Sequence, residues 1–141
     1  MNNNKKIIGK IMTNIEKTIK YCPVEMSLDL ITKKWVIQIV RDMMFGKKHF
    51  NEFKENKPKL TNKVLSRCLK QMECNNLIIK NIDPENPKNI EYELTKKGKS
   101  LNKIIYELAM YTVNTDEYNQ YYSEETKKNI KKLFKEKLNI K

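Results

Sequence analysis

The spacing of apolar residues along the chain predicts helices over most of its length and one β-hairpin. Apolar side chains recur every three or four residues in residues 5–19, 24–31, 35–45, 61–74, 96–113 and 123–138, which is the period of a helix with one buried face. Residues 49–54 are expected to form a further short helix. Residues 77–94 instead show a β-branched run and a two-residue alternation about a turn rich in Asp, Asn and Pro, which predicts a hairpin. The predicted fold class is therefore mainly α with a small β-hairpin.

The helix predicted at residues 61–74 has two faces of different chemistry. Thr61 is the expected N-cap, and Asn75 with Asn76 is the expected stop, because Asn tolerates the left-handed conformation of a helix end. One face is apolar and comprises Val64, Leu65, Cys68, Leu69 and Met72. The other carries amide, hydroxyl and cationic groups, on Asn62, Lys63, Ser66, Arg67 and Lys70. No carboxylate occurs from residue 59 to residue 72, so we expect this face to enter a DNA groove as the second helix of a helix-turn-helix.

The predicted hairpin follows this helix directly, in the position of the wing of a winged helix-turn-helix. Its turn carries Asp83 and Glu85 as well as lysine, so its charge is mixed. The side chains of the wing that are expected to reach a phosphate or the minor groove are Lys80, Lys88 and Asn89.

Amphipathic helices flank this domain on both sides. We expect an N-terminal helix within residues 1–20, a winged helix-turn-helix in residues 21–95, a dimerisation helix in residues 96–113, and a linker with a C-terminal helix in residues 114–141. The apolar stripe of residues 96–113 is too long to be covered by the wing and the helix before it, so part of it is expected to pack on a second subunit. The predicted interface residues are Ile11, Ile15, Leu101, Ile104, Ile105, Leu108 and Tyr111.

The chain carries a formal net charge of +12, which favours a polyanionic partner such as DNA, RNA or an anionic membrane. Lysines are scattered along the whole chain and only Arg41 and Arg67 are arginine, so charge alone does not decide between these partners. No apolar run approaches the ~20 residues of a membrane span and no signal peptide opens the chain, so we expect a cytoplasmic protein without a membrane partner. RNA is disfavoured because no aromatic residues alternate with the basic ones for base stacking.

Three cysteines and one histidine leave few candidates for metal binding or catalysis. No CxxC spacing is present, so we expect no metal site, no cofactor and no enzyme activity. Cys22 precedes Pro23 at a predicted helix start, where free N–H groups and the helix dipole favour a thiolate. It is thus either a reactive thiol or a small residue that fills a gap under a dimer contact. Cys68 is expected to be a packed thiol, and Cys74 a more exposed one.

Four segments, in order, resemble the HxlR-type winged helix-turn-helix family: YCPVEMSLDLITKKW, IVRDMMFGKKHFNEF, LTNKVLSRCLKQME and IEYELTKKGKSL. The resemblance covers about residues 21–112. It implies a dimeric, DNA-binding transcription regulator of bacteria or archaea. Several members sense electrophiles or oxidants through the cysteine of the C-P-V segment, which corresponds to Cys22 here. Arg67 and Cys68 stand where the family often has Gln and Arg, so the resemblance does not extend to the operator sequence.

These observations together predict a homodimeric transcriptional regulator that binds double-stranded DNA at a pseudo-palindromic operator. Redox or electrophile sensing through Cys22 is the expected switch. Two alternatives remain: a winged-helix module that binds another protein, and a regulator that responds to a small ligand at the dimer interface.

Overall fold

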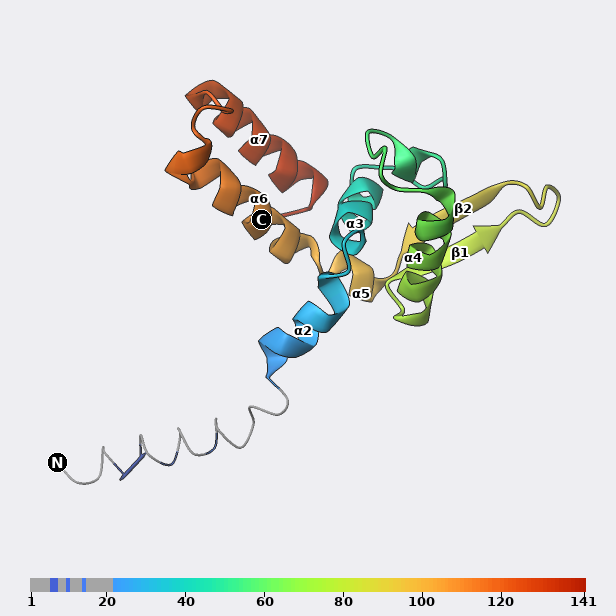
Figure 1. Cartoon of the computed structure of the whole chain (residues 1–141), viewed down its shortest axis with the longest axis horizontal. Helices are drawn as coiled ribbons and strands as arrows, with labels where there is room; N and C mark the ends of the chain where they lie inside the picture. Colours follow the sequence, from blue (N-terminus) through green and yellow to red (C-terminus); the bar gives the residue numbers. More distant parts are fainter. Residues whose placement is uncertain (1–5, 8–9, 11–13, 15–21) are drawn as a thin grey trace. The chain divides into compact units, whose positions relative to one another are not determined.

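The computed structural model describes residues 6, 7, 10, 14 and 22–141 (Figure 1). It divides into two units, Met1–Lys34 and Trp35–Lys141. In the first unit, helix α2 (Pro23–Ile31) begins as predicted, with Pro23 in its first turn and Cys22 at its N-cap. Most of the predicted helix at 5–19 lies outside the described residues, and this includes the predicted interface residues Ile11 and Ile15.

The second unit contains the part of the predicted winged helix-turn-helix that follows residue 34. Its elements follow in the order α3 (Val36–Met44), η2 (Glu52–Lys54), α4 (Asn62–Cys74), β1 (Ile78–Ile82), β2 (Ile90–Leu94), α5 (Lys96–Lys99), α6 (Asn102–Asn114), η3 (Asp116–Tyr118) and α7 (Glu124–Lys137). The predicted helix at 49–54 is only the 3₁₀ turn η2. Its Glu52 carboxylate accepts the backbone N–H groups of Lys48 (3.3 Å) and His49 (2.9 Å), and these hydrogen bonds lower the pKa of Glu52.

The core of this unit is formed by α3, η2, α4 and the hairpin. Ile39 and Val40 of α3, Phe53 of η2 and Leu65 of α4 have no solvent exposure. The Phe53 ring meets the Tyr92 ring of β2 edge to face, with centroids 6.1 Å apart. The apolar face of helix α4 therefore packs in this core, while its polar face is exposed to solvent.

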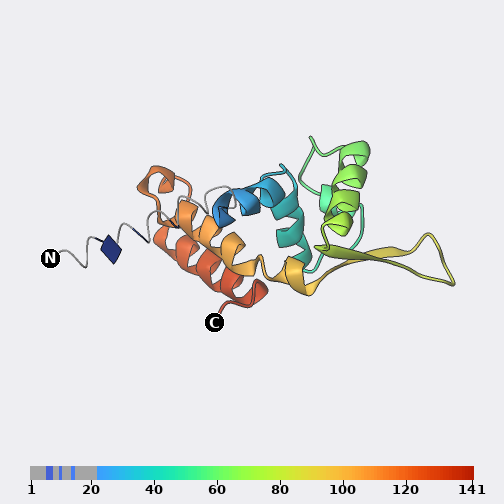
Figure 2. The ribbon, with the colours of Figure 1, turned by 90° about the horizontal axis from the view of Figure 1, so that it is seen from below.

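The two strands pair antiparallel, with Ile78 opposite Leu94 and Ile82 opposite Ile90. The hairpin extends away from the helices (Figure 2). Its base is fixed by a backbone hydrogen bond from the Tyr92 N–H to the Lys48 carbonyl, 2.8 Å long. Of the five residues of β1, only Ile78 is buried, so most of the strand projects as a wing.

The helix predicted at 96–113 is wrong in one respect, because it is two helices, α5 and α6. The predicted cap is present: the Thr95 hydroxyl accepts the Gly98 N–H. The last turn of α5 is then tightened by a 3.2 Å hydrogen bond from the Leu101 N–H to the Gly98 carbonyl. The Ser100 hydroxyl also donates to the Lys97 carbonyl at 2.6 Å, and such bonds compete with continued helix.

Helices α6 and α7 lie side by side in both views (Figures 1 and 2). The Asn102 amide donates to the Leu138 carbonyl (2.9 Å), and the Phe134 ring packs edge to face on Phe45, with centroids 5.2 Å apart. Ser123 caps α7 as predicted, its hydroxyl accepting the Thr126 N–H. The apolar stripe of the C-terminal helix therefore covers its own chain at Phe134 and Leu138, while Leu133 stays exposed.

Candidate nucleic-acid interface

The predicted groove-facing helix is α4, and its two faces are divided as expected. Thr61 caps it, with its hydroxyl accepting the Val64 N–H at 3.2 Å. Asn76 adopts the left-handed conformation that ends it, with φ of 58°. The buried side chains of α4 are Leu65, Cys68, Leu69 and Met72. The outer-face side chains Asn62, Lys63, Ser66, Arg67 and Lys70 are all exposed.

The cationic groups of this outer face have no partner within the part of the chain that the structure describes. No ion pair or hydrogen bond there engages the side chain of Lys63, Arg67 or Lys70. Their charges are therefore available to an external anion.

Asn62 differs from these residues, because its side chain is already oriented. Its Oδ1 accepts a hydrogen bond from the Nζ of Lys54, which lies in η2. The amide N–H₂ of Asn62 is then the end left for an external acceptor. The sequence analysis missed this contact, because eight residues and a turn separate the pair.

A hollow of about 500 Å³ lies between α4 and the hairpin. It brings together Ser66 and Lys70 from α4 with Lys80 from β1, which the sequence placed only on separate elements. Glu73 lies in the same hollow beside Tyr92, whose pKa is raised chiefly by burial and further by the Glu73 charge. The hydroxyl of Ser66, the ammonium groups of Lys70 and Lys80 and the carboxylate of Glu73 thus border a space between helix and wing.

The tip of the wing is less favourable for an anion. The Asp83 carboxylate accepts the Glu85 N–H at 2.9 Å, and this hydrogen bond, with a lesser one from the Asn89 amide, lowers the pKa of Asp83. Asn89 is therefore engaged with a carboxylate, while Lys88 is exposed. Of the three wing residues predicted to reach DNA, only Lys80 adjoins α4.

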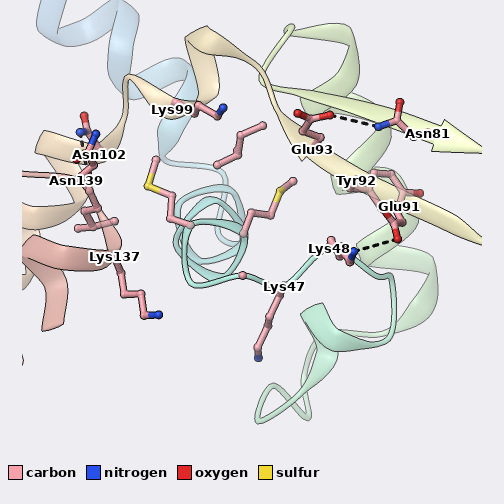
Figure 3. A pocket seen from close by; sticks show the side chains of 15 residues that line it. Lys47, Lys48, Asn81, Glu91, Tyr92, Glu93, Lys99, Asn102, Lys137 and Asn139 are labelled. Atoms are coloured by element: carbon pink, nitrogen blue, oxygen red, sulfur yellow. Dashed lines mark hydrogen bonds and ion pairs between the residues drawn. The ribbon is translucent and has the colours of Figure 1, made fainter.

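A further hollow, of about 530 Å³, is bordered by the C-terminal end of α3, by β2 and by the end of α7 (Figure 3). The carboxylate of Glu91 pairs there with Lys48 (3.1 Å), and Glu93 accepts a hydrogen bond from Asn81 (3.4 Å). None of the nine predicted DNA-binding residues lines this hollow. Their locations are therefore α4, its N-cap and the wing.

A buried ion pair, which had no signal in the sequence, joins the connection before α4 to α3. Lys57, in the polar connection before the helix, is 8% exposed, and its Nζ donates to Oδ2 of Asp42 on α3 and to the Phe53 carbonyl (3.1 Å). Asp42 is 5% exposed and also accepts from Arg41. The connection that leads to α4 is thus tied to α3. A lysine in a polar run gave no signal of this.

The three cysteines lie in different environments. Cys22 is half-buried at the start of α2, and its side chain makes no cap hydrogen bond. Cys68 is buried as predicted, and burial raises the pKa of its thiol to about 11. Cys74 is exposed, also as predicted.

The predicted interface residues of 96–113 do not all face outward. Leu101 and Ile105 are 8% and 3% exposed, so the chain itself already covers these two predicted interface residues. Ile104, Leu108 and Tyr111 are 38%, 52% and 73% exposed. The apolar stripe therefore has a buried part that packs in the core and an exposed part that faces solvent.

Among the described residues, no group of three or more His, Cys, Asp or Glu side chains could hold a metal ion. The helices that the structure describes are also too short or too polar to cross a bilayer.

Comparisons with known proteins agree with this geometry. A family model described as HxlR-like helix-turn-helix matches residues 30–120. The uncharacterised HTH-type transcriptional regulator YvaP of Bacillus subtilis is 37% identical over 64% of this chain and 84% of its own length. The HTH-type transcriptional regulator YodB of the same organism is 33% identical over 64% of this chain and 81% of its own. Among solved structures, the redox regulator HypR in its oxidised form is 32% identical, with a TM-score of 0.61, and the match covers 67% of this chain and 97% of that one.

Proposed function

We propose that this chain acts as a homodimer on a pseudo-palindromic operator. It belongs to the HxlR-like helix-turn-helix family and is a DNA-binding transcriptional regulator of the winged-helix type. Two α4 helices would then enter successive major grooves about 34–36 Å apart. Regulators of this family are not enzymes, and no residue is assigned to catalysis.

The observation that carries the proposal is the outer face of α4. It presents five exposed amide, hydroxyl and cationic side chains, and no carboxylate lies between residues 59 and 72; Glu73 follows at the end of the helix. Arg67 is assigned to base readout, because a guanidinium can donate two hydrogen bonds to guanine and discriminate by about 1–3 kcal/mol. Asn62 and Ser66 follow as secondary base contacts, with Asn62 acting as a donor because Lys54 holds its oxygen.

The remaining candidates are assigned to the DNA backbone. Lys63 and Lys70 flank the base-reading residues and contact phosphates, which position the protein without reading sequence. Lys80 adds a phosphate contact from the wing, across the hollow that it shares with Ser66 and Lys70. Thr61, Lys88 and Asn89 complete the proposed contact set at the two ends of this surface.

The dimer is assigned to the apolar residues that the chain leaves exposed on α6. Ile104, Leu108 and Tyr111 form a surface that an isolated chain would leave in water. Residues 1–20, with Ile11 and Ile15, are proposed as a further dimer contact.

Cys22 is proposed as the sensor. It starts a helix, where a thiolate is favoured, and a 32% identical relative is a redox regulator. Cys22 lies before residues 30–120, the part that the family model matches. Operator binding of the wild type and of Cys22→Ser, each with and without diamide, tests this role. An oxidant effect that is absent in Cys22→Ser supports it. An unchanged affinity in both proteins contradicts it and leaves the small-ligand alternative.

Selection of bound fragments from genomic DNA with purified protein tests the function as a whole. We expect one enriched motif with two half-sites a helical turn apart. The affinity should fall steeply as salt rises, because lysine and arginine displace counterions from DNA. A protein that enriches no motif and whose DNA affinity is independent of salt would instead be a protein-binding module.

A further inference from the structure

A hollow of about 360 Å³ lies among α3, α6 and α7, within the unit Trp35–Lys141. Residues 37, 38 and 41 of α3 line it, and none of them is among the buried residues of that helix. Its size falls within the range of small-molecule sites, about 300–1,000 Å³. Most of its lining is apolar and comprises Ile37, Ile105, Leu108, Ala109, Val113, Ile130 and Phe134.

Among the described residues that line this hollow, Arg41 alone is charged. Its Nε and Nη2 both donate to Oδ1 of Asp42, at 3.1 and 2.9 Å. The other oxygen of that carboxylate accepts the buried ammonium of Lys57. Two cations therefore share one carboxylate, and the cluster keeps a net charge of +1 beside an apolar space. The remaining guanidinium N–H groups are available to a second anion.

We propose that this hollow binds a small apolar carboxylic acid in its anionic form, with the carboxylate on Arg41 and the hydrocarbon part among α3, α6 and α7. Carboxylate and guanidinium match in geometry and can form two parallel hydrogen bonds. The apolar lining excludes strongly hydrated anions such as phosphate or citrate. A ligand of this class explains the combination of one unbalanced cation with a mostly apolar wall, in which Gln38, Thr112 and Tyr122 are the other polar residues.

Arg41 also connects the hollow to α4. Asp42 links Arg41 to Lys57, and the Lys57 carbonyl accepts the Leu60 N–H at 3.0 Å, one residue before the Thr61 cap of α4. A bound carboxylate shares the Arg41 guanidinium with Asp42 and so weakens the attraction between Arg41 and Asp42. The interactions of Asp42 with Arg41 and Lys57 then change, and with them the ion pair that fixes the connection before α4. The acid is therefore an effector of DNA binding, an inference that rests on the proposed function.

The ligand arm of the test uses calorimetry on the full chain without DNA. Benzoate and octanoate are compared with their neutral amides, benzamide and octanamide. We expect the acids to bind the wild type, and to bind Arg41→Gln about 10–100-fold more weakly, because a hydrogen-bonded charge pair is lost. Ala109→Phe, which fills the hollow, abolishes binding. Lys128→Gln, an exposed cation on α7 outside the hollow, serves as the matched control and binds as the wild type does.

Several results would overturn the proposal. Amides that bind as tightly as the acids would remove Arg41 from the site. Acids that bind Ala109→Phe unchanged would lie elsewhere on the chain. If no acid binds and Ala109→Phe instead alters self-association in sedimentation, the hollow is filled by a second copy of the chain. Circular dichroism of each variant verifies that it is folded, and the acid–amide comparison on the wild type needs no variant.

The DNA arm separates this inference from the proposed function. Acid at saturating concentration should change the operator affinity of the wild type by about 5–150-fold, the usual range of allosteric coupling, and should leave Arg41→Gln unaffected. A chain that binds acid without any change in DNA affinity contradicts the effector role. A chain that binds operator but no acid contradicts the site alone, and one that binds acid but no DNA contradicts the proposed function alone.

Discussion

The ammonium of Lys57 and the carboxylate of Asp42 form a buried ion pair that joins the connection before α4 to helix α3. The two residues are fifteen positions apart. Lys57 also donates to the Phe53 carbonyl, so its three-donor head group is well satisfied in the core. The pair holds the chain where it turns toward the proposed DNA-binding helix.

Breaking this pair should destabilise the fold, and the two partners should differ. Asp42→Asn leaves a buried ammonium without its counter-charge and should cost about 3–5 kcal/mol of unfolding free energy. Lys57→Met should cost less, because Arg41 still neutralises Asp42 and methionine fills the space. Urea unfolding measures both.

Lys47→Gln is the control for these variants. It removes an ion pair with Glu55 (3.3 Å) in which Glu55 is well exposed, and should cost less than about 1 kcal/mol. Equal losses of unfolding free energy for all three variants would show that the buried ion pair stabilises the fold no more than the exposed one.

Arg67→Ala and Lys70→Ala should affect DNA binding in different ways. Arg67→Ala should weaken operator binding by about 1–3 kcal/mol and leave non-specific binding almost unchanged, because a base contact is lost. Lys70→Ala should weaken both alike and reduce the salt slope by about one, as expected for a phosphate contact. Fluorescence polarisation with operator and scrambled duplexes at several salt concentrations distinguishes them. A uniform loss with Arg67→Ala would reassign that residue to a phosphate.

Cys68 should make stability depend on pH in the alkaline range. Its pKa is about 11 in the folded chain, above the ordinary value of 9.0, so the folded state holds the thiol proton more tightly. This contribution is fully present below pH 9 and is lost as pH rises through 11. Urea unfolding of the wild type and Cys68→Ala from pH 8 to 11 isolates it, since other groups titrate alike in both. A difference between the two proteins that does not vary with pH would contradict the assignment.

The two sides of α6 should respond differently to substitution. Ile104→Glu and Tyr111→Glu place charge on exposed positions, and should dissociate the proposed dimer with little change in monomer stability. Leu101→Ala removes a buried side chain and should cost about 2–5 kcal/mol of unfolding free energy. Sedimentation equilibrium and urea unfolding provide the two readouts. A wild-type protein that sediments as a monomer would contradict the proposed interface.

Much of the candidate site could be predicted because its signals are local. The Thr61 cap, the Asn76 stop and the division of α4 into two faces each depend on residues within a few positions. The break between α5 and α6 was missed, because apolar spacing continues through Ser100 and Leu101. Its cause includes a packing constraint: a Cβ on Gly98 would lie 2.2 Å from the Leu77 carbonyl, so α5 is pressed against the start of the wing.

The order of helices, hairpin and caps, and with it the exposed face of α4, follows from the sequence, because helical period and capping are properties of neighbouring residues. The burial of Lys57, the place of Leu101 in the core and of Tyr111 outside it, and the common hollow of Lys70 and Lys80 follow only from the folded chain. Each of these depends on a partner from another element. The burial of Lys57, for example, is tolerable only because Asp42 lies opposite it.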